Sequence, residues 1–439
     1  MLFKNAVICA IEPETQTVTP FKGHVLIDQG KIERFFSEQE TSLPDTETEI
    51  DLHGRVLTVP NVNFHEHIYS RLAKGLPING PMDNFVHILQ TLWWKLDRFL
   101  DLDMVQASAE LTVLEAVRHG VTYLFDHHAS PAPDAVKGSL QRIADTLQKA
   151  GLRGVLAFEV SDRNGAEIAR ESIAENAEFA AAQTSEIKAM MGLHAPFTLS
   201  DETLRRVADV VRALELGIHI HVAEDRADVE HTRKEHGLSI ARRLQSFNLL
   251  NERSLLIHGV HLGDEDYRII REHGAALAYN PDSNLNNAVG LPHYAAVPKE
   301  IPVLAGTDGM HANVVRSLKQ LFLLYRHQGN SFDKAFAWLQ KIFFDQLRFV
   351  QRYFPDFPLL RQGDRADFIV WDYVPPTPFT AENFWGHYIY AMTEAPIYSV
   401  VQNGGLLLHE RNFTRLDEKA LQENIIRQGH RLYERFKTK

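Results

Sequence analysis

Residues 59–75 read Val-Pro-Asn-Val-Asn-Phe-His-Glu-His-Ile-Tyr-Ser-Arg-Leu-Ala-Lys-Gly. An apolar run with high β-strand propensity leads into two histidines one residue apart, His65 and His67. Because side chains alternate between the two faces of a strand, both imidazoles point the same way and can approach one metal ion. Two nearby histidines among 22 can also arise by coincidence. The interpretation therefore depends on whether matching residues recur at the ends of later strands.

Strand-like runs alternate with segments of helical period from residue 59 onward. Further strands are predicted at 121–125, 155–160, 187–193, 217–222, 254–257, 275–278 and 301–305, and helices at 103–118, 135–150, 165–182, 202–213, 240–247 and 264–273. With the opening strand, this makes eight strands separated mostly by helices. The pattern is typical of an α/β protein whose parallel sheet closes as a (β/α)8 TIM barrel.

The two ends of the chain have a different sequence pattern. Residues 1–58 contain short β-rich runs without a convincing helix. A β-rich pattern returns after residue 363 and precedes a predicted terminal helix at 416–437. The simplest arrangement pairs both ends in one small flanking β-sandwich. We therefore expect two domains, a sandwich of residues 1–58 plus 363–439 that includes the C-terminal helix, and a (β/α)8 barrel of residues 59–362.

Candidate ligands recur at the predicted strand ends, where a TIM barrel carries its chemistry. They are His65, His67, His221, Glu224, His258 and Asp308. Three imidazoles and one carboxylate suit Zn2+ or Fe2+ with a coordination position left for water. Each residue has a plainer alternative: the two carboxylates can cap helices, and His258 can be a core histidine. Jointly these alternatives are improbable, because accidents would not place every candidate at the same end of the barrel.

Other histidines near these strand ends are interpreted as structural. His219 shares a strand face with His221, but the position at the strand end favours His221 as the ligand. His127, His128 and His261 are expected to be structural or to support the ligands.

Composition excludes several classes of function. A net charge of −11 and a pI near 6.1 argue against a nucleic-acid partner, which requires a concentrated basic surface. The single cysteine, Cys9, excludes an intramolecular disulfide and a Cys-rich metal site. No window approaches the roughly 18 apolar residues of a membrane span, and the N-terminal run is too short for a signal peptide. We expect a cytoplasmic protein without a membrane partner.

The motif set His65-x-His67, His221-x-x-Glu224, His258 and Asp308 resembles the amidohydrolase superfamily in its deaminase and chlorohydrolase branch. Within that branch the chain is most similar to SsnA-type aminohydrolases. The stretches that carry this finer resemblance are residues 92–97, 126–131, 159–163, 284–290 and 372–378.

The resemblance implies a role for each residue at the site. It assigns metal ligation to His65, His67, His221 and Asp308, proton transfer to Glu224, and orientation of water or substrate to His258. Asp308 would also stabilise the attacking hydroxide. Substrate contact is assigned to His194, with Arg153, Trp94, Gln90 and Asp126 as further pocket candidates. Relatives with two ions bridge them by a modified lysine at the end of strand four. The nearest lysine, Lys188, lies six residues before His194, or about 20 Å along a strand, so one ion is expected.

The function implied is hydrolytic deamination of an aminated heterocycle, such as a purine or pyrimidine, by a metal-bound hydroxide. Dechlorination and cyclic-amide hydrolysis would use the same site, and a non-catalytic metal-binding accessory protein is an alternative of another class. The expected partners are a small heterocyclic molecule and a second copy of the chain in a homodimer. The chain departs from the family pattern at Asn61, Glu66 and His311. Gln90 stands where nucleoside-binding relatives place a Glu, which weakens an inference of ribose binding.

Overall fold

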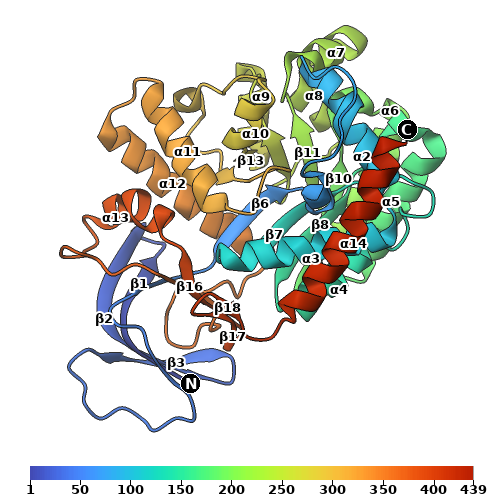
Figure 1. Cartoon of the computed structure of the whole chain (residues 1–439). Coiled ribbons are helices and arrows are strands. Elements are labelled where there is room, and N and C mark those ends of the chain that lie inside the picture. The colour runs from blue at the N-terminus through green and yellow to red at the C-terminus, as the bar shows by residue number, and fades with distance from the viewer. Residues whose placement is uncertain (439) are drawn as a thin grey trace.

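Two parallel sheets form the centre of the molecule in the computed structural model, which describes residues 1–438 (Figure 1). One sheet has the order β6 (Asn61–Glu66), β7 (Val121–His128), β8 (Arg153–Phe158) and β9 (Ile187–Ala189). The other has the order β10 (Met191–Leu193), β11 (Ile218–Val222), β12 (Leu255–His258), β13 (Ala276–Tyr279) and β14 (Val303–Ala305). Every residue of β7 and β8 is buried, as expected for parallel strands covered on both faces.

The two sheets meet at both of their edges. An isolated parallel bridge joins Val160, after β8, to Leu193 of β10, and a second joins Glu66 of β6 to Asp308, after β14. The strands therefore follow one another around a ring in chain order. The single strand predicted at 187–193 is wrong in detail. It is interrupted at Met190, because the chain pairs with β8 up to Ala189 and with β11 from Met191 onward.

Helices separate most of these strands, as the sequence pattern predicts. Between and after the strands lie α3 (Leu102–Arg118), α4 (Ser139–Lys149), α5 (Ala166–Ala181), α6 (Asp201–Leu214), α7 (Arg226–His236), α8 (Ile240–Ser246), α9 (Asp264–His273), α10 (Pro281–Asn286), α11 (Val314–His327) and α12 (Phe332–Gln351). Side-chain caps define several of their starts: Ser200 accepts from the Thr203 amide before α6, and Ser331 accepts from the Lys334 amide before α12.

The segment between β6 and α3 contains structure that the sequence pattern did not predict. It comprises the short helix η1 (Ile68–Ala73), α1 (Phe85–Ile88), the π-helical turn η2 (Leu89–Trp93) and α2 (Trp94–Phe99). In this turn the backbone widens to i→i+5 hydrogen bonding, which is frequent near functional sites.

The two ends of the chain pair in one mixed sheet of nine strands. Its order is β18 (Asn412–Phe413), β17 (Gly405–His409), β16 (Ile397–Gln402), β15 (Phe368–Trp371), β5 (Val56–Thr58), β1 (Leu2–Glu12), β2 (Thr17–Asp28) and β3 (Lys31–Ser37), with β4 (Glu49–Asp51) paired to β1. The sheet is joined to the parallel core where β5 leads into β6, and α13 (Phe384–Tyr390) lies between β15 and β16 in sequence. The two-layer sandwich and its exact domain boundaries stay predictions.

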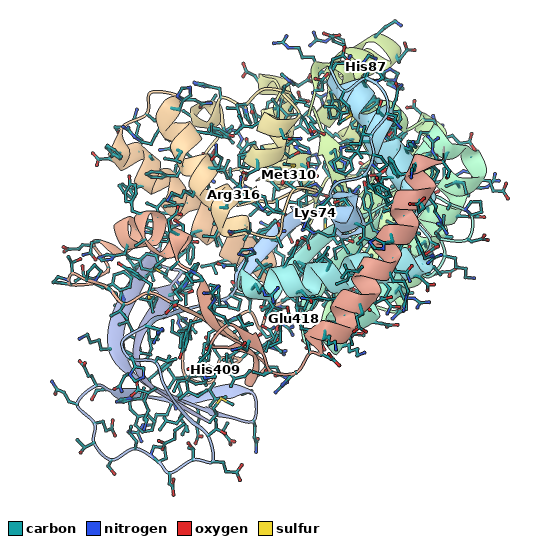
Figure 2. The ribbon with its side chains drawn as sticks, viewed as in Figure 1. Lys74, His87, Met310, Arg316, His409 and Glu418 are labelled. Atoms are coloured by element: carbon teal, nitrogen blue, oxygen red, sulfur yellow. The ribbon has the colours of Figure 1, made fainter. Side chains whose placement is uncertain are left out.

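The C-terminal helix α14 (Glu418–Lys437) lies along α3, on the helical side of the molecule (Figure 1). Glu418 lies at its beginning (Figure 2). This residue forms an ion pair with Arg118 at the end of α3. Near the other end of α14, Arg435 donates to Asp101, the residue that caps α3. The helix predicted to belong with the flanking sheet thus contacts helices around the parallel strands, and its assignment to a domain stays a prediction.

Candidate metal centre

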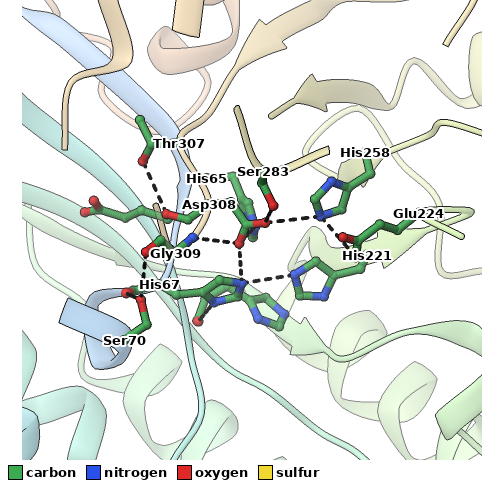
Figure 3. A network of polar contacts seen from close by, with 12 residues as sticks. His65, His67, Ser70, His221, Glu224, His258, Ser283, Thr307, Asp308 and Gly309 are labelled. Atoms are coloured by element: carbon green, nitrogen blue, oxygen red, sulfur yellow. Dashed lines mark hydrogen bonds and ion pairs between the residues drawn. The ribbon is translucent and has the colours of Figure 1, made fainter. Parts of the chain in front are cut away.

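Four predicted ligands converge on one point at the ends of β6, β11 and β14 (Figure 3). Asp308 Oδ1 lies 3.0 Å from His67 Nε2 and 3.7 Å from His65 Nε2. His221 Nε2 lies 3.3 Å from His67 Nε2. The side chains of His65, His67 and Asp308 can offer ligand atoms within 4.8 Å of one another, as can those of His65, His221 and His258. Residues more than 240 positions apart in sequence thus form one cluster.

Hydrogen bonds from the rear of the rings fix which nitrogen faces the cluster. Nδ1 of His67 donates to the His127 carbonyl at 2.7 Å, and Nδ1 of His221 donates to the His194 carbonyl at 2.8 Å. His65 Nδ1 lies 2.9 Å from His219 Nε2. With a proton on Nδ1, each Nε2 keeps its lone pair for a ligand. Both His219 and His221 are buried, but His219 lies behind His65, which is consistent with the prediction of His221 as the ligand.

Asp308 is held as an anion at the centre of the cluster. Burial alone would raise the pKa of this carboxyl, but the imidazoles of His65 and His67 outweigh that effect and hold the pKa well below its usual range. Ser283 Oγ donates to Oδ2 at 2.5 Å, and the Gly309 amide donates to Oδ1 at 2.7 Å. The carboxylate is therefore fixed in orientation as well as in charge.

Two residues at these strand ends have a strained backbone. His258 has φ of 71° and Asp308 has φ of 54°, both in the left-handed region that L-residues rarely adopt. Such conformations cost of the order of 1–3 kcal/mol each and persist where surrounding structure imposes them. His258 is held in place by its Nδ1, which donates to Asn284 Oδ1 at 2.7 Å. Its Nε2 faces Glu224 Oε2 at 3.4 Å and Asp308 Oδ2 at 3.7 Å.

Glu224 lies beside the cluster with a pKa matched to proton transfer. Burial raises the pKa of this carboxyl from 4.5 to about 7. Its Oε1 accepts from Asn287 Nδ2 at 3.4 Å. A group with a pKa near neutrality can both take and give a proton at neutral pH.

The donor set fits a divalent metal ion. Nε2 of His65 and Nε2 of His258 are buried without a hydrogen-bond partner, an arrangement that normally costs free energy and that a cation beside them would relieve. His65, His67, His221 and Asp308 would hold the ion. Three neutral imidazoles and one carboxylate are a usual set for a catalytic site with an open coordination position.

Gly306, between β14 and Asp308, keeps space for His65. A Cβ at this position would lie 2.3 Å from Asn280 Oδ1 and 2.8 Å from both the Cβ and the carbonyl oxygen of His65. We expect Gly306→Ala to displace His65, lower zinc affinity about 10- to 100-fold and cost about 1–3 kcal/mol of stability. Zinc titration and urea unfolding measure the two effects. Gly386→Ala, with open space around the new Cβ, is the control, and equal zinc affinity in both variants would contradict the prediction.

A cavity opens onto the cluster and is walled partly by aromatic side chains. Its lining includes His67, His221, Glu224, His258, Asp308, Asn287, His194, Phe85, Leu89, Trp93, Trp94, Phe197, Asp97, Glu159 and Arg163. The structure thus brings His194 and Trp94, two predicted substrate contacts, into the same cavity as the ligands. The π-helical turn and α2 supply much of the apolar wall.

Three other residues that were predicted to contact the substrate lie outside the cavity lining. Arg153 begins β8, so it lies at the strand end opposite the ligands. There its guanidinium donates to Glu186 and Asp356, each at 2.7–2.9 Å, and is 1% exposed. Gln90 is exposed and outside the cavity lining. Asp126 is buried behind His67, where it accepts from the Ile68 amide at 2.8 Å. None of the three lines the cavity, so the structure does not support their assignment as substrate contacts.

Sequence reasoning missed a charged cluster in the cavity wall. Arg163 pairs with Asp97 and with Glu159, the second at 2.6 Å. Both segments had been noted in the family resemblance without a role for these residues. These residues could have been predicted from one signal. They are charged, and they lie in stretches that resemble the family but are outside the ligand motifs.

Each residue that departs from the family pattern has a polar partner nearby. Glu66, which faces away from the cluster, is 0% exposed and accepts from Arg71 at 2.5 Å and from Asn63 at 3.1 Å. Asn61 donates to the His119 carbonyl at 2.9 Å. His311 lies 3.4 Å from the carboxylate of Asp282. None of them stands between the ligands and the cavity.

His128 makes the stability of the protein sensitive to acid. It follows His127, whose carbonyl accepts from Nδ1 of His67. Burial lowers the pKa of His128 to about 3, and its Nε2 is paired with Ser130 Oγ at 2.8 Å. The unfolded chain takes up a proton below about pH 6.5 and the folded chain does not, so stability present above that pH is lost as pH falls toward 3.

At pH 5.5 this loss is about 1.4 kcal/mol relative to pH 7.5. Between these pH values, the free energy of unfolding of His128→Asn, measured with urea, should fall by about 1.4 kcal/mol less than that of the unaltered protein. His430→Gln, at an exposed position on α14, should leave the fall unchanged. Equal falls in the His128 variant and the unaltered protein would contradict the prediction.

Comparison with known proteins gives the family of the chain. The model of the Amidohydrolase family matches residues 61–407. A 5-methylthioadenosine/S-adenosylhomocysteine deaminase of Desulforudis audaxviator is 26% identical over 455 residues, with 99% of each chain covered. A 5'-deoxyadenosine deaminase of Methanosarcina mazei is 25% identical over 447 residues, covering 100% of this chain and 99% of the relative. Among solved structures, an adenosine deaminase from Xanthomonas campestris with bound zinc is similar with a TM-score of 0.82 at 19% identity, covering 98% and 99% of the two chains.

The chain belongs to the amidohydrolase family, which confirms the prediction from the histidine, glutamate and aspartate motifs. It is an enzyme, a hydrolase acting on C–N bonds, so the alternative of a non-catalytic accessory protein is wrong. The finer likeness to SsnA-type aminohydrolases stays a prediction. None of the helices described over residues 1–438 has the length and apolarity needed to cross a bilayer.

Proposed function

We propose that this protein deaminates an aminated heterocycle by hydrolysis and depends on one divalent ion, zinc or iron(II). The observation that carries the proposal is the position of Glu224. Its carboxyl, with a pKa of about 7, shares a cavity and a partner, His258, with the ligand cluster. The deaminase names of the relatives support the same reaction.

The fold supports this assignment through the placement of the strand ends. We take the ring of β6 to β14 as the (β/α)8 TIM barrel, since parallel bridges link the two sheets at both edges. In that architecture the carboxyl ends of the strands carry the active site. A single ion is favoured because Lys188 lies on β9, and no lysine is among the described residues that line the cavity.

A bound divalent ion would lower the pKa of water from about 15.7 toward about 7 and so supply a nucleophile at neutral pH. Glu224 takes the proton of the attacking water and delivers it to a ring nitrogen, and then assists departure of ammonia. His258 Nε2, facing both Glu224 and Asp308, orients water or the substrate. Phe85, Trp93 and Trp94 supply aromatic surface on which a flat ring can lie.

The substrate candidates follow from the relatives. Their names specify 5-methylthioadenosine, S-adenosylhomocysteine and 5'-deoxyadenosine, which all carry an aminated purine. We propose a small heterocycle with an aminated ring of this kind as substrate. A homodimer and a cytoplasmic location remain our expectations from the sequence.

The test is ammonia release by the zinc-loaded enzyme from adenosine, 5'-methylthioadenosine, guanine and cytosine. At least one compound should be turned over with kcat/KM of about 10^4 M⁻¹s⁻¹ or more, and EDTA should abolish the activity. Chloride release from a chlorinated triazine, or opening of a cyclic amide, is measured in parallel. Either of these reactions without ammonia release would overturn the proposed deamination while leaving the hydrolytic site intact.

A further inference from the structure

We infer that the cavity selects uncharged or cationic aminated rings and discriminates against substrates with a carboxylate or phosphate substituent, because its one guanidinium is already held by two carboxylates. This inference rests on the proposed function and deepens it. The guanidinium belongs to Arg163, and its partners are Asp97 and Glu159.

Both terminal nitrogens of Arg163 are already paired with carboxylates. Nη2 pairs with Asp97, and Nη1 donates to Glu159 Oε1 at 2.6 Å. Nε is buried without a partner. Proteins bind carboxylates and phosphates best through both arms of a free arginine fork. Here an anion would have to share each arm with a carboxylate that already accepts from it, and it would meet the negative charge of that carboxylate.

Burial as well as ion pairing holds Arg163 and its two carboxylate partners in place. The side chains of Asp97, Glu159 and Arg163 are 1%, 3% and 9% exposed. The guanidinium carbon of Arg163 lies 5.5 Å from the centre of the Trp94 ring, so the aromatic wall covers it. Long side chains fixed in this way rarely reorient, because breaking a buried pair leaves an uncompensated charge.

The composition of the lining has the same consequence. Among the described residues that line the cavity, Arg163 is the only lysine or arginine. The carboxyl groups in the lining are those of Asp97, Glu159, Glu224, Asp225, Asp228 and Asp308. An anionic substituent therefore finds carboxyl groups and no unpaired lysine or arginine there.

The experiment compares two matched pairs of ligands on the zinc-loaded, full-length enzyme. The pairs are adenosine with adenosine 5'-monophosphate, and cytosine with 5-carboxycytosine. Binding is followed by quenching of tryptophan fluorescence, since Trp93 and Trp94 line the cavity. We expect the neutral member of each pair to bind at least about tenfold more tightly, since an anionic substituent finds carboxyl groups and no unpaired guanidinium or ammonium group in the lining.

Asp97→Asn, which frees one arm of Arg163, should reduce the ratio of the affinities for the neutral and the anionic ligand at least about fivefold. Glu159→Gln should act in the same direction and serves as the second variant, with thermal melting as the check on folding. Asp225→Asn is the matched control, because it removes one negative charge from the lining and leaves Arg163 paired. It should reduce the ratio by less than either of the other two substitutions.

Equal or tighter binding of the anionic members by the unaltered enzyme would overturn the inference, as would failure of both neutral rings to bind. An unchanged ratio in a folded Asp97 or Glu159 variant would also overturn it. Ammonia release is measured on the same four compounds. Selective binding of the neutral rings without ammonia release would leave the inference standing and overturn the proposed deamination.

Discussion

Replacement of Glu224 by glutamine is expected to lower kcat for ammonia release by about 10²- to 10⁴-fold, the usual contribution of a positioned general acid–base group. Glutamine keeps the size of the side chain and can still accept from Asn287, but it cannot take a proton from water. Because Glu224 lies outside the set of His65, His67, His221 and Asp308, the variant should keep its zinc. Steady-state ammonia assays and metal analysis measure the two quantities on one preparation.

Glu230→Gln provides the matched control for this prediction. Glu230 lies on α7, six residues further along the chain, and is exposed. Its substitution should change neither kcat nor metal content. A Glu224 variant that turns over at the unaltered rate would remove this residue from proton transfer, and a variant that loses zinc would make it part of the metal site instead.

Replacement of Arg153 by methionine is expected to cost about 2–4 kcal/mol of stability and to leave KM unchanged. The guanidinium is buried between Glu186 and Asp356, and Arg365 contacts the same two carboxylates from the flanking sheet side of the chain. Removing Arg153 leaves two carboxylates sharing one cation. We place the estimate near the lower end of the range for buried pairs, because Glu186 and Asp356 are partly exposed and water can reach them.

Urea unfolding at pH 7.5 measures this loss, and a substrate titration measures KM. Arg206→Met is the control, since its pair with Glu202 on α6 is exposed at both ends and should contribute less than about 0.5 kcal/mol. If Arg153→Met raised KM without a loss of stability, the residue would belong to substrate binding after all.

The sequence was sufficient to predict the ligand cluster because the parallel strands determine it. Polar residues at the carboxyl ends of successive parallel strands must meet at one edge, so His65, His221 and Asp308 could be grouped without knowledge of the packing. The same rule, applied strictly, would have excluded Arg153. That residue begins its strand, whereas the ligands end theirs.

The remainder of the cavity depends on contacts that no local pattern specifies. Asp97 and Arg163 are 66 positions apart in sequence and pair only because α2 lies over the end of β8 and the residues after it. The π-helical turn before Trp94 has no distinct periodicity, so the aromatic wall was not predicted. Arg71, the partner of Glu66, lies only five residues further on, in a short helix whose path could not be inferred from the sequence.

The most direct test of the metal centre is an anomalous difference map, collected at the zinc absorption edge from crystals of the zinc-loaded protein. We predict a single peak in contact with Nε2 of His65, His67 and His221 and with the carboxylate of Asp308. A peak elsewhere, two peaks, or a peak that His221 or Asp308 does not contact would contradict the account of this site.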